Sequence, residues 1–236
     1  MSGELTFSVR AGSEVSPAEW AEVSSLFSTE YGFYSKAAPR NAGERIRLSE
    51  GYYRRSYATG DYRVALCRDG EGLIAEAIYL ERRTSRGMVA LVVQLVVAAD
   101  YRRRGVASTL LHSVWGFSDY YAWGIVSSNA YTIEALQGAT FRKASPAVMA
   151  ESADWLRSEV LDGVPFLAKA EWRLAAGESV AVTSFFTDRT QLSDSTESVR
   201  ARLGELAEGE EWLAIVFRHQ EAIDVKSRSF LRMEAA

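Results

Sequence analysis

The stretch AADYRRRGVASTLLHSVW, residues 98–115, decides how the rest of the chain is interpreted. Three arginines, 102–104, are followed by Gly105 and by the start of an amphipathic helix. A helix N-terminus already carries unpaired N–H groups and about half a positive charge. Further cations there are unfavourable unless an anion binds, and phosphate is the anion that suits such a place. The stretch therefore predicts a phosphate-binding turn.

Composition excludes several classes of protein. The chain has 236 residues, is 47% hydrophobic and carries a net charge of -4, so it can bury a large core and does not resemble a general nucleic-acid binder. The N-terminal segment MSGELTFSVR lacks the features of a signal peptide, and no apolar run is long enough for a membrane span. We therefore expect a cytoplasmic protein.

Cysteine and histidine are too few for a structural zinc site or an intramolecular disulfide. The chain has one cysteine, Cys67, and two histidines. Cys67 lies in an alternating apolar run, which predicts a buried and unreactive thiol. His112 is expected at the surface or half-buried on the helix that follows Gly105, without a catalytic role.

Before Arg102 the sequence predicts strands and two capped helices. Ser16, Pro17 and Glu19 form a helix-start pattern for a helix ending at Gly32. Asn41 with Glu44 repeats the capping pattern and predicts a second helix reaching about Tyr57. Asp-Gly-Glu-Gly at 69–72 predicts a hairpin. The strands are expected at 5–10, 63–68, 73–81 and 88–97, the last of them nearly all Val, Leu and Ala, as in a central strand.

After Arg102 the expected order is helix, strand, helix and strand, followed by a smaller region. The boundaries of the first four are 105–120, 123–128, 131–137 and a strand beginning at Phe141. The smaller region is predicted to contain a helix at 145–160, strands at 169–174, 179–186 and 211–217, and a helix at 194–206. We divide the chain into a domain of residues 1–175 and a C-terminal α/β extension of residues 176–236.

With these elements placed, the opening stretch resembles a known signature. Arg102-x-x-Gly105-x-Ala107 between a central strand and a helix is similar to the acetyl-CoA signature of the GCN5-related N-acetyltransferases (GNATs), which follows the fourth strand in that family. Asn129 and Phe141 match an asparagine and a phenylalanine of the same family. The resemblance covers about residues 5–145. It implies a mixed, mostly antiparallel central sheet flanked by helices.

The resemblance implies acetyl-CoA as co-substrate. Gly105 lets the backbone approach an anion, and Ala107 keeps the next contact small. In the family, the end of the fourth strand lies along the pantetheine arm and donates an N–H to the acetyl carbonyl. A run of solvated arginines with no ligand is the alternative. The candidate cofactor-binding residues are Leu95, Val96, Val97, Arg102, Arg103, Arg104, Gly105, Val106, Ala107, Ser108 and Asn129.

Acyl transfer to an amine needs a base, and Glu76 is the first candidate. Strand alternation puts Glu76 on the same face as Ile74 and Ile78. A carboxylate on an apolar face should have a raised pKa. The alternative is that Glu76 pairs with an arginine beneath a helix.

The resemblance also implies a tyrosine that acts as the general acid for the departing thiolate. This sequence has no tyrosine at the corresponding position. The family's tyrosine falls at Leu136 here, and Thr140 replaces the glycine that usually precedes Phe141. Tyr131 could replace the missing acid only if the helix were rotated.

The acceptor site is expected where the first two helices connect. Glu30, Tyr31 and Tyr34 lie in this connection, and an ordinary packed loop is an equally good interpretation. The C-terminal extension could supply either one wall of the acceptor site or a surface for a homodimer.

The sequence as a whole predicts an N-acetyltransferase that moves an acetyl group from acetyl-CoA to a primary amine of a small molecule or peptide. Direct attack in a ternary complex is expected, because Cys67 lies on an early strand and is a poor nucleophile for a covalent route. The alternative, favoured by Leu136, is a catalytically weak or inactive module that senses acetyl-CoA and acts through the extension. Neither nucleic acid nor a membrane is expected as a partner.

Overall fold

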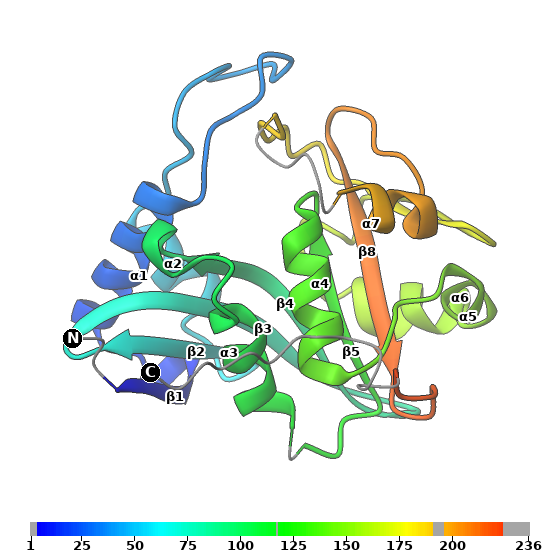
Figure 1. Cartoon of the computed structure of the whole chain (residues 1–236), viewed down its shortest axis with the longest axis horizontal. Coiled ribbons are helices and arrows are strands. Elements are labelled where there is room, and N and C mark those ends of the chain that lie inside the picture. Colours follow the sequence, from blue (N-terminus) through cyan, green and yellow to red (C-terminus); the bar gives the residue numbers. More distant parts are fainter. Residues whose placement is uncertain (1–3, 117, 191–195, 224–236) are drawn as a thin grey trace.

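Strands and helices follow one another along the chain in the computed structural model, which describes residues 4–116, 118–190 and 196–223 (Figure 1). The strands are β1 (Leu5–Ala11), β2 (Tyr62–Asp69), β3 (Gly72–Thr84), β4 (Gly87–Val97), β5 (Ala122–Ser127), β6 (Glu171–Ala175), β7 (Glu178–Val182) and β8 (Glu210–Phe217). The helices are α1 (Pro17–Glu30), α2 (Glu50–Tyr57), α3 (Val106–Trp115), α4 (Ala130–Thr140), α5 (Pro146–Glu151), α6 (Ala153–Trp155) and α7 (Thr196–Leu203), with short 3-10 turns η1 (Gly12–Glu14) and η2 (Ala99–Tyr101) and a π-helical segment η3 (Leu156–Leu161).

All the strands of the described residues belong to one sheet. Its order is β1-β2-β3-β4-β5-β8-β7-β6, and only the β4–β5 pair is parallel. This is the predicted mixed, mostly antiparallel sheet of a GNAT-like fold, with four strands before Arg102. The β6–β7 hairpin crosses the expected boundary between residues 175 and 176, and β8 pairs with β5. The division into two domains stays a prediction.

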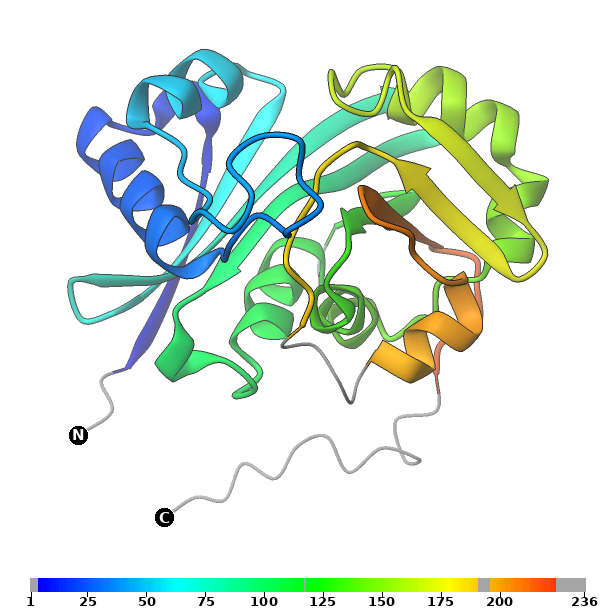
Figure 2. The ribbon, with the colours of Figure 1, turned by 90° about the horizontal axis from the view of Figure 1, so that it is seen from above.

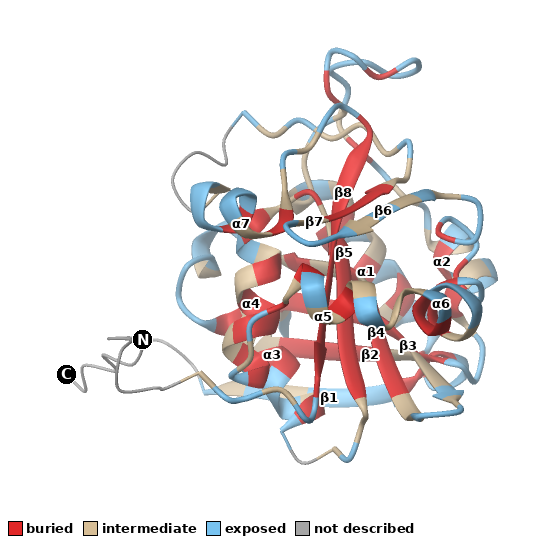
Figure 3. Ribbon diagram, turned by 90° about the vertical axis from the view of Figure 1, so that its right-hand side faces the viewer, coloured by how far each residue is buried: buried red, intermediate tan, exposed pale blue. Residues whose placement is uncertain are grey.

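Helices cover both faces of the sheet. Figure 2 shows α1 and α2 on one side and α3 with α4 on the other. The apolar stripe of α1 is buried, with Trp20 and Val23 at most 1% exposed. Figure 3 shows the buried residues concentrated along the middle strands, and every residue of β8 is buried. The core therefore runs through the centre of the sheet, where β4, β5 and β8 lie next to one another in this order.

The predicted start of α1 is confirmed. The Ser16 hydroxyl accepts the Glu19 N–H, and the Glu19 carboxylate accepts the Ser16 N–H at 2.9 Å. This reciprocal pair satisfies two N–H groups that the helix itself leaves free. The hairpin at Asp69 to Gly72 is also confirmed, since β2 and β3 pair across it.

The predicted helix from Asn41 to Tyr57 is wrong in its first half. Helix α2 begins only at Glu50, where the Ser49 hydroxyl accepts the Tyr52 N–H. Asn41 has a left-handed backbone with φ of 57°, whereas a helix N-cap needs an extended one. The segment before α2 instead folds as a loop, closed by a β-bridge between Phe33 and Arg45.

Three further boundaries differ from the sequence predictions. Phe141 starts no strand, because it ends α4 in a left-handed conformation with φ of 54°. Helix α3 ends at Trp115 rather than at 120. Strand β7 ends at Val182 rather than at 186, because the chain then crosses to the loop after α1. The expected helix start at Asp194 lies outside the described residues.

No helix in the described part of the chain is both long enough and apolar enough to span a lipid bilayer.

We expect Gly12→Ala to destabilise the fold. A Cβ at this position would lie 1.9 Å from the backbone carbonyl oxygen of Tyr57, at the end of α2, which a side-chain rearrangement cannot relieve. The free energy of unfolding should fall by about 1 to 3 kcal/mol, the range for overpacking. Gly60→Ala is the matched control, because a Cβ there meets nothing within 4 Å. Equal urea midpoints for the two variants would contradict this account of the contact.

Candidate active site

The two central strands part at one end. The parallel ladder between β4 and β5 comprises four pairs and ends at Val92 and Ile125. Strand β4 continues to Val97 while remaining paired with β3, and a register shift beside Ile78 leaves Val93 without an opposing residue. The β5-facing edge of β4 therefore has no strand partner beyond Val92. This edge contains Leu95, Val96 and Val97, the predicted contacts of the pantetheine arm.

A tight turn connects the end of β4 to α3. After η2, Arg103 has a left-handed backbone with φ of 59°, and so does Gly105 with φ of 79°. In the described part of the chain, no carbonyl or side chain accepts the N–H groups of residues 103–108. A Cβ at Gly105 would meet nothing within 4 Å, so the glycine is open to its surroundings. Six free amides at a helix N-terminus form a concave donor surface suited to an anion.

The three arginines of the turn have different surroundings. The Arg102 guanidinium donates to the Val97 carbonyl oxygen at 2.9 Å and pairs with the Glu30 carboxylate at 3.1 Å. Arg104 lies over the Tyr101 ring, with its guanidinium carbon 5.3 Å from the ring centroid. Arg102 thus fixes the turn to the end of α1, which leaves Arg103 and Arg104 as the cations without a carboxylate partner in the described chain.

Glu30, a predicted acceptor-site residue, is engaged in the same turn. Its carboxylate accepts the Ala99 N–H at 2.9 Å in addition to the Arg102 bond. Glu30 therefore connects α1 to the segment between β4 and α3. An acceptor-binding role for Glu30 stays a prediction.

Helix α4 begins at Asn129, close to the end of β5. The Asn129 side chain caps the helix by accepting the Tyr131 N–H at 3.0 Å. Leu136 is fully buried, so its position faces the core. Tyr131 lies in the first turn and is 38% exposed. Of the two positions considered for an acid, only that of Tyr131 reaches the surface.

Glu76 is buried without a basic partner. It has no exposed surface, and its Oε1 accepts a hydrogen bond of 2.6 Å from Gln94 Nε2, which also donates to the Tyr53 hydroxyl. Its Oε2 has no partner in the described residues. Burial raises the pKa of Glu76 to about 8, although the Gln94 hydrogen bond opposes this shift. The alternative pairing of Glu76 with an arginine is absent from the described chain.

A second buried carboxylate, Glu211 on β8, was not predicted. It is 5% exposed. Burial raises the pKa of Glu211 to about 7, and hydrogen bonding to the Thr183 hydroxyl and the Ser128 N–H opposes this shift. Strand alternation could have suggested that one of the adjacent residues Glu210 and Glu211 faces the interior. It could not say which of them lacks a cation.

Tyr31 packs among aromatic rings. Burial raises the pKa of the Tyr31 hydroxyl, and the negative charges of Glu211 and Glu76 raise it further. The Tyr31 ring stacks on Phe27, with centroids 4.3 Å apart, and lies 5.9 Å from the ring of Phe185. The predicted acceptor residue Tyr31 therefore contacts both α1, through Phe27, and the segment after β7, through Phe185.

The loop after α1 and the segment after β7 meet over this part of the sheet (Figure 2). Tyr34 forms a β-bridge with Thr187, and the Ser35 N–H donates to the Phe186 carbonyl oxygen at 3.0 Å. The Tyr34 ring lies edge-on to Phe185. The C-terminal part of the chain thus contacts the loop in which acceptor residues were predicted.

The other candidate reactive side chains are Cys67, on β2, and His112, on α3. Cys67 is fully buried on β2, and burial raises the pKa of its thiol to about 11. His112 is exposed, as predicted, and its Nδ1 lies 2.8 Å from the Ala139 carbonyl oxygen, which joins α3 to α4. In the described residues, no three His, Cys, Asp or Glu side chains are arranged to hold a metal ion.

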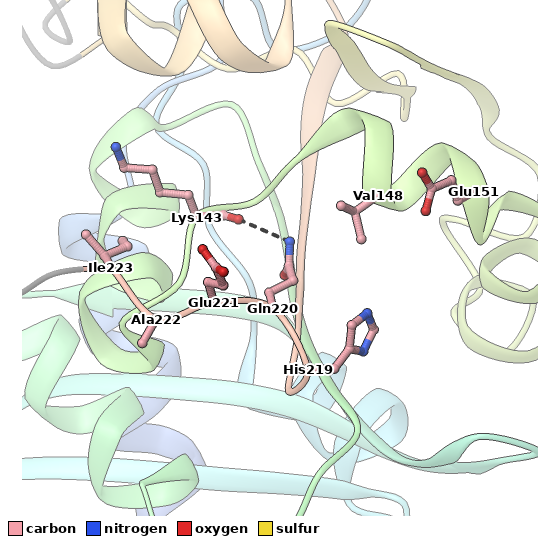
Figure 4. A pocket seen from close by; sticks show the side chains of 8 residues that line it. All are labelled: Lys143, Val148, Glu151, His219, Gln220, Glu221, Ala222 and Ile223. Atoms are coloured by element: carbon pink, nitrogen blue, oxygen red, sulfur yellow. Dashed lines mark hydrogen bonds between the residues drawn. The ribbon is translucent and has the colours of Figure 1, made fainter.

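A hollow of about 550 Å³ lies near the other end of β8 (Figure 4). Lys143, Glu151, His219 and Glu221 are among its lining residues, and Gln220 Nε2 donates to the Lys143 carbonyl oxygen at 3.5 Å. At the rise of an antiparallel strand this end is roughly 25 Å from the start of β8. The hollow is therefore separate from the site around Tyr31.

No protein-family model and no curated protein matches the sequence. Among solved structures, a GNAT-family acetyltransferase from Streptococcus pneumoniae is similar over 90% of this chain and 99% of its own, with 11% identity and a TM-score of 0.46. The ribosomal-protein-S18-alanine N-acetyltransferase from Escherichia coli is similar over 59% of this chain and 80% of its own, with 14% identity and a TM-score of 0.42.

An aminoglycoside acetyltransferase from an uncultured soil metagenomic sample, crystallised with sisomicin, is also similar. The similarity covers 48% of this chain and 68% of that protein, with 11% identity and a TM-score of 0.36. At these identities and TM-scores, the similarities by themselves assign neither a family nor an activity to this chain.

We expect the stability of the protein to depend on pH through Glu76. The folded-state pKa is raised, so the stabilising proton is fully bound below the ordinary glutamate range and is lost as the pH rises through about 8. The free energy of unfolding should fall across this window by up to about 1.4 kcal/mol per pH unit. Glu76→Gln cannot ionise and should show a smaller fall when urea unfolding is compared at about pH 5 and about pH 9. Parallel pH profiles for the two proteins would mean that Glu76 is solvated.

Proposed function

We propose that this protein is an N-acetyltransferase that transfers the acetyl group of acetyl-CoA to a primary amine. The observation that carries the proposal is the set of six free amides at residues 103–108, located where β4 has parted from β5. The amides suit a pyrophosphate, and the unpaired edge of β4 suits an extended arm that ends in a thioester. A phosphate-binding turn beside such a strand edge is the arrangement that the signature at Arg102 to Ala107 implies.

The residues that would bind the coenzyme follow from this geometry. The N–H groups of Arg103 to Ser108 would bind the pyrophosphate, and Arg103 and Arg104 would add charge-assisted bonds. Leu95, Val96 and Val97 would lie along the pantetheine arm. Asn129, at the end of β5, would flank the arm on its other side. Arg102 would act indirectly, by fixing the turn to α1 through Glu30.

The proposed reaction proceeds in a ternary complex. The ammonium group of the acceptor transfers a proton to the Glu76 carboxylate, and the neutral nitrogen attacks the thioester carbon. The C–N bond forms, the C–S bond breaks, and the thiolate leaves with the electron pair and takes up the second proton that the nitrogen loses. A raised pKa makes the ionised fraction of Glu76 a stronger base than an ordinary glutamate. A thiol of ordinary acidity, with a pKa of about 8.5, can leave without strong acid assistance.

The alternative, an acetyl-CoA sensor without turnover, is favoured by the burial of Leu136, which removes the acid implied by the resemblance. A screen of primary amines with acetyl-CoA, in which thiol release is the measured signal, distinguishes the transferase from the sensor. Thiol release on at least one amine supports the transferase. Coenzyme binding without release on any amine supports the sensor.

We expect Gly105→Glu to abolish coenzyme binding. The new carboxylate would occupy the open side of the amides and repel the pyrophosphate, raising the Kd for coenzyme A by about a hundredfold or more. Isothermal titration calorimetry measures this directly. Gly70→Glu is the matched control, because Gly70 also has a positive φ and an open Cβ position but lies in the β2–β3 turn. If Gly105→Glu bound coenzyme A as tightly as Gly70→Glu, the site assignment would be wrong.

We also expect the acetylation rate to rise with pH without a fall below about pH 9, because no tyrosine has to stay protonated for the thiolate to leave. Tyr131→Phe should keep the same profile under saturating acetyl-CoA. A descending limb that disappears in Tyr131→Phe would instead identify Tyr131 as the acid.

A further inference from the structure

A chain of hydrogen bonds connects α2 to the buried carboxylate of Glu76. Gln94 on β4 is 7% exposed, and its Nε2 donates to Glu76 Oε1 at 2.6 Å and to the Tyr53 hydroxyl oxygen at 2.8 Å. Tyr53 and Glu76 are both fully buried. A carboxamide nitrogen carries two hydrogens, and both are used here. The Gln94 amide is therefore held between α2 and β3.

The pairing of β3 with β4 explains why Gln94 reaches Glu76. Gln94 lies opposite Ile78, and Glu76 lies opposite Val96. These registers make Gln94 and Glu76 diagonal neighbours on one face of an antiparallel pair. Since Tyr53 approaches from α2, this is the face that α1 and α2 cover (Figure 2). Glu76 is thus paired with Val96, one of the residues proposed to lie along the arm of the coenzyme.

Aromatic packing holds Tyr53 in place. Its ring stacks on Trp20 of α1, with centroids 5.8 Å apart, and lies edge-on to Phe27 at 6.2 Å. Trp20 and Phe27 are themselves at most 3% exposed. A ring enclosed by close-packed neighbours has few alternative positions. The Tyr53 hydroxyl therefore offers Gln94 a fixed acceptor.

The donor to Glu76 is neutral, unlike the partner of Glu210. Glu210 binds the Arg173 guanidinium at 2.7 Å, and this bond lowers the pKa of Glu210. Burial raises the pKa of Glu76 to about 8, although the Gln94 hydrogen bond opposes the shift. A neutral amide can orient a carboxylate without the cation that would remove its affinity for a proton. Gln94 therefore orients Glu76 and leaves it basic.

We propose that Gln94 is a positioning residue that holds Oε1 of Glu76 and so leaves Oε2 as the atom that takes the proton from the acceptor. The inference rests on the proposed acetyltransferase function. Oε2 has no partner among the described residues. The N–H bond of the acceptor ammonium breaks, its proton forms an O–H bond at Oε2, and the nitrogen keeps the electron pair with which it attacks the thioester.

The other titratable groups that act on Glu76 are tyrosines of α2 and of the end of α1. They are Tyr31, Tyr53 and Tyr57, and burial raises the pKa of all three hydroxyls. These hydroxyls therefore stay protonated where Glu76 titrates. Leu66 and Val96, the partners of Glu76 on β2 and β4, carry no charge. A change at Gln94 should therefore be visible in the titration of Glu76.

Gln94→Met tests the inference, because methionine has a similar length and donates no hydrogen bond. Losing a hydrogen bond to an ionised group should raise the apparent pKa of Glu76 by about one unit. Under saturating acetyl-CoA and acceptor, the inflection of kcat should move up by the same amount. The ratio of wild-type to variant kcat should then be about tenfold larger at about pH 7 than at about pH 10. A ratio that is constant with pH would indicate a merely structural role and overturn the proposal.

Tyr53→Phe removes the other anchor of the Gln94 amide. The inflection should move in the same direction but by less, because Gln94 keeps its bond to Glu76. Tyr57→Phe is the matched control, since Tyr57 lies on the same helix, is 8% exposed and makes no hydrogen bond to Gln94 in the described structure. It should leave the inflection in place. Equal shifts in the two variants would overturn the role assigned to the Tyr53 hydroxyl.

Urea unfolding tests the same hydrogen bond without any substrate. The folded-state pKa of Glu76 is raised, so the free energy of unfolding falls as the pH rises through about 8. In Gln94→Met this fall should extend about one pH unit higher. In a Glu76→Gln background, Gln94→Met should leave the pH dependence unchanged, because no carboxyl group titrates there. A shift that persists in that background would assign the titration to another group and overturn the proposal.

The two kinds of measurement separate this inference from the proposed function. Thiol release by the wild-type protein, with neither the kcat inflection nor the unfolding window moved in Gln94→Met, would overturn the role of Gln94 and leave the transferase in place. Absence of thiol release with every amine would overturn the transferase and the catalytic part of the inference. The unfolding window would then still decide whether Gln94 holds the Glu76 carboxylate.

Discussion

The structure depends on the point at which β4 and β5 stop pairing. Four ladder pairs hold the two strands together, and beyond Val92 and Ile125 they separate although both continue. A parallel pair inside an otherwise antiparallel sheet needs a long crossover, which α3 provides. The turn with the free amides of residues 103–108 lies at the start of that crossover, and Asn129 lies at the end of β5. The same break in pairing therefore exposes a strand edge and places the free amides beside it.

The second constraint is the burial of acidic groups near this break. Glu210 shows how the fold neutralises a buried carboxylate, with a guanidinium from the neighbouring hairpin. Glu76 and Glu211 receive only neutral donors, from Gln94, Thr183 and Ser128. Their pKa values are raised by burial and can respond to what enters the site.

The C-terminal part of the chain takes part in the same site. Segment 183–188 follows β7 and joins the loop after α1 through the bridge between Tyr34 and Thr187. Glu211 reaches the region from β8, which lies between β5 and β7. Strand β8 is buried along its whole length. Residues from both halves of the chain therefore meet beside Tyr31 and Tyr34.

The sequence by itself determined the features that depend on neighbouring residues. Gly105 between a central strand and a helix, the capping pair Ser16 and Glu19, and the hairpin at 69–72 are local, because turn geometry and helix ends are set within a few residues. The alternation around Glu76 predicted its burial and raised pKa, since side chains along a strand alternate between faces.

Tertiary structure decided the rest. Asn41 carries a capping pattern but adopts a left-handed backbone, because the loop around it closes on the bridge between Phe33 and Arg45. The sequence contains Glu210 and Glu211 side by side, and only the pairing of β8 with β7, which brings Arg173 to one of them, left the other without a cation. Contacts between distant strands carry no local sequence signal. The buried surroundings of Glu211 therefore depend on the pairing of β8 with β5 and β7.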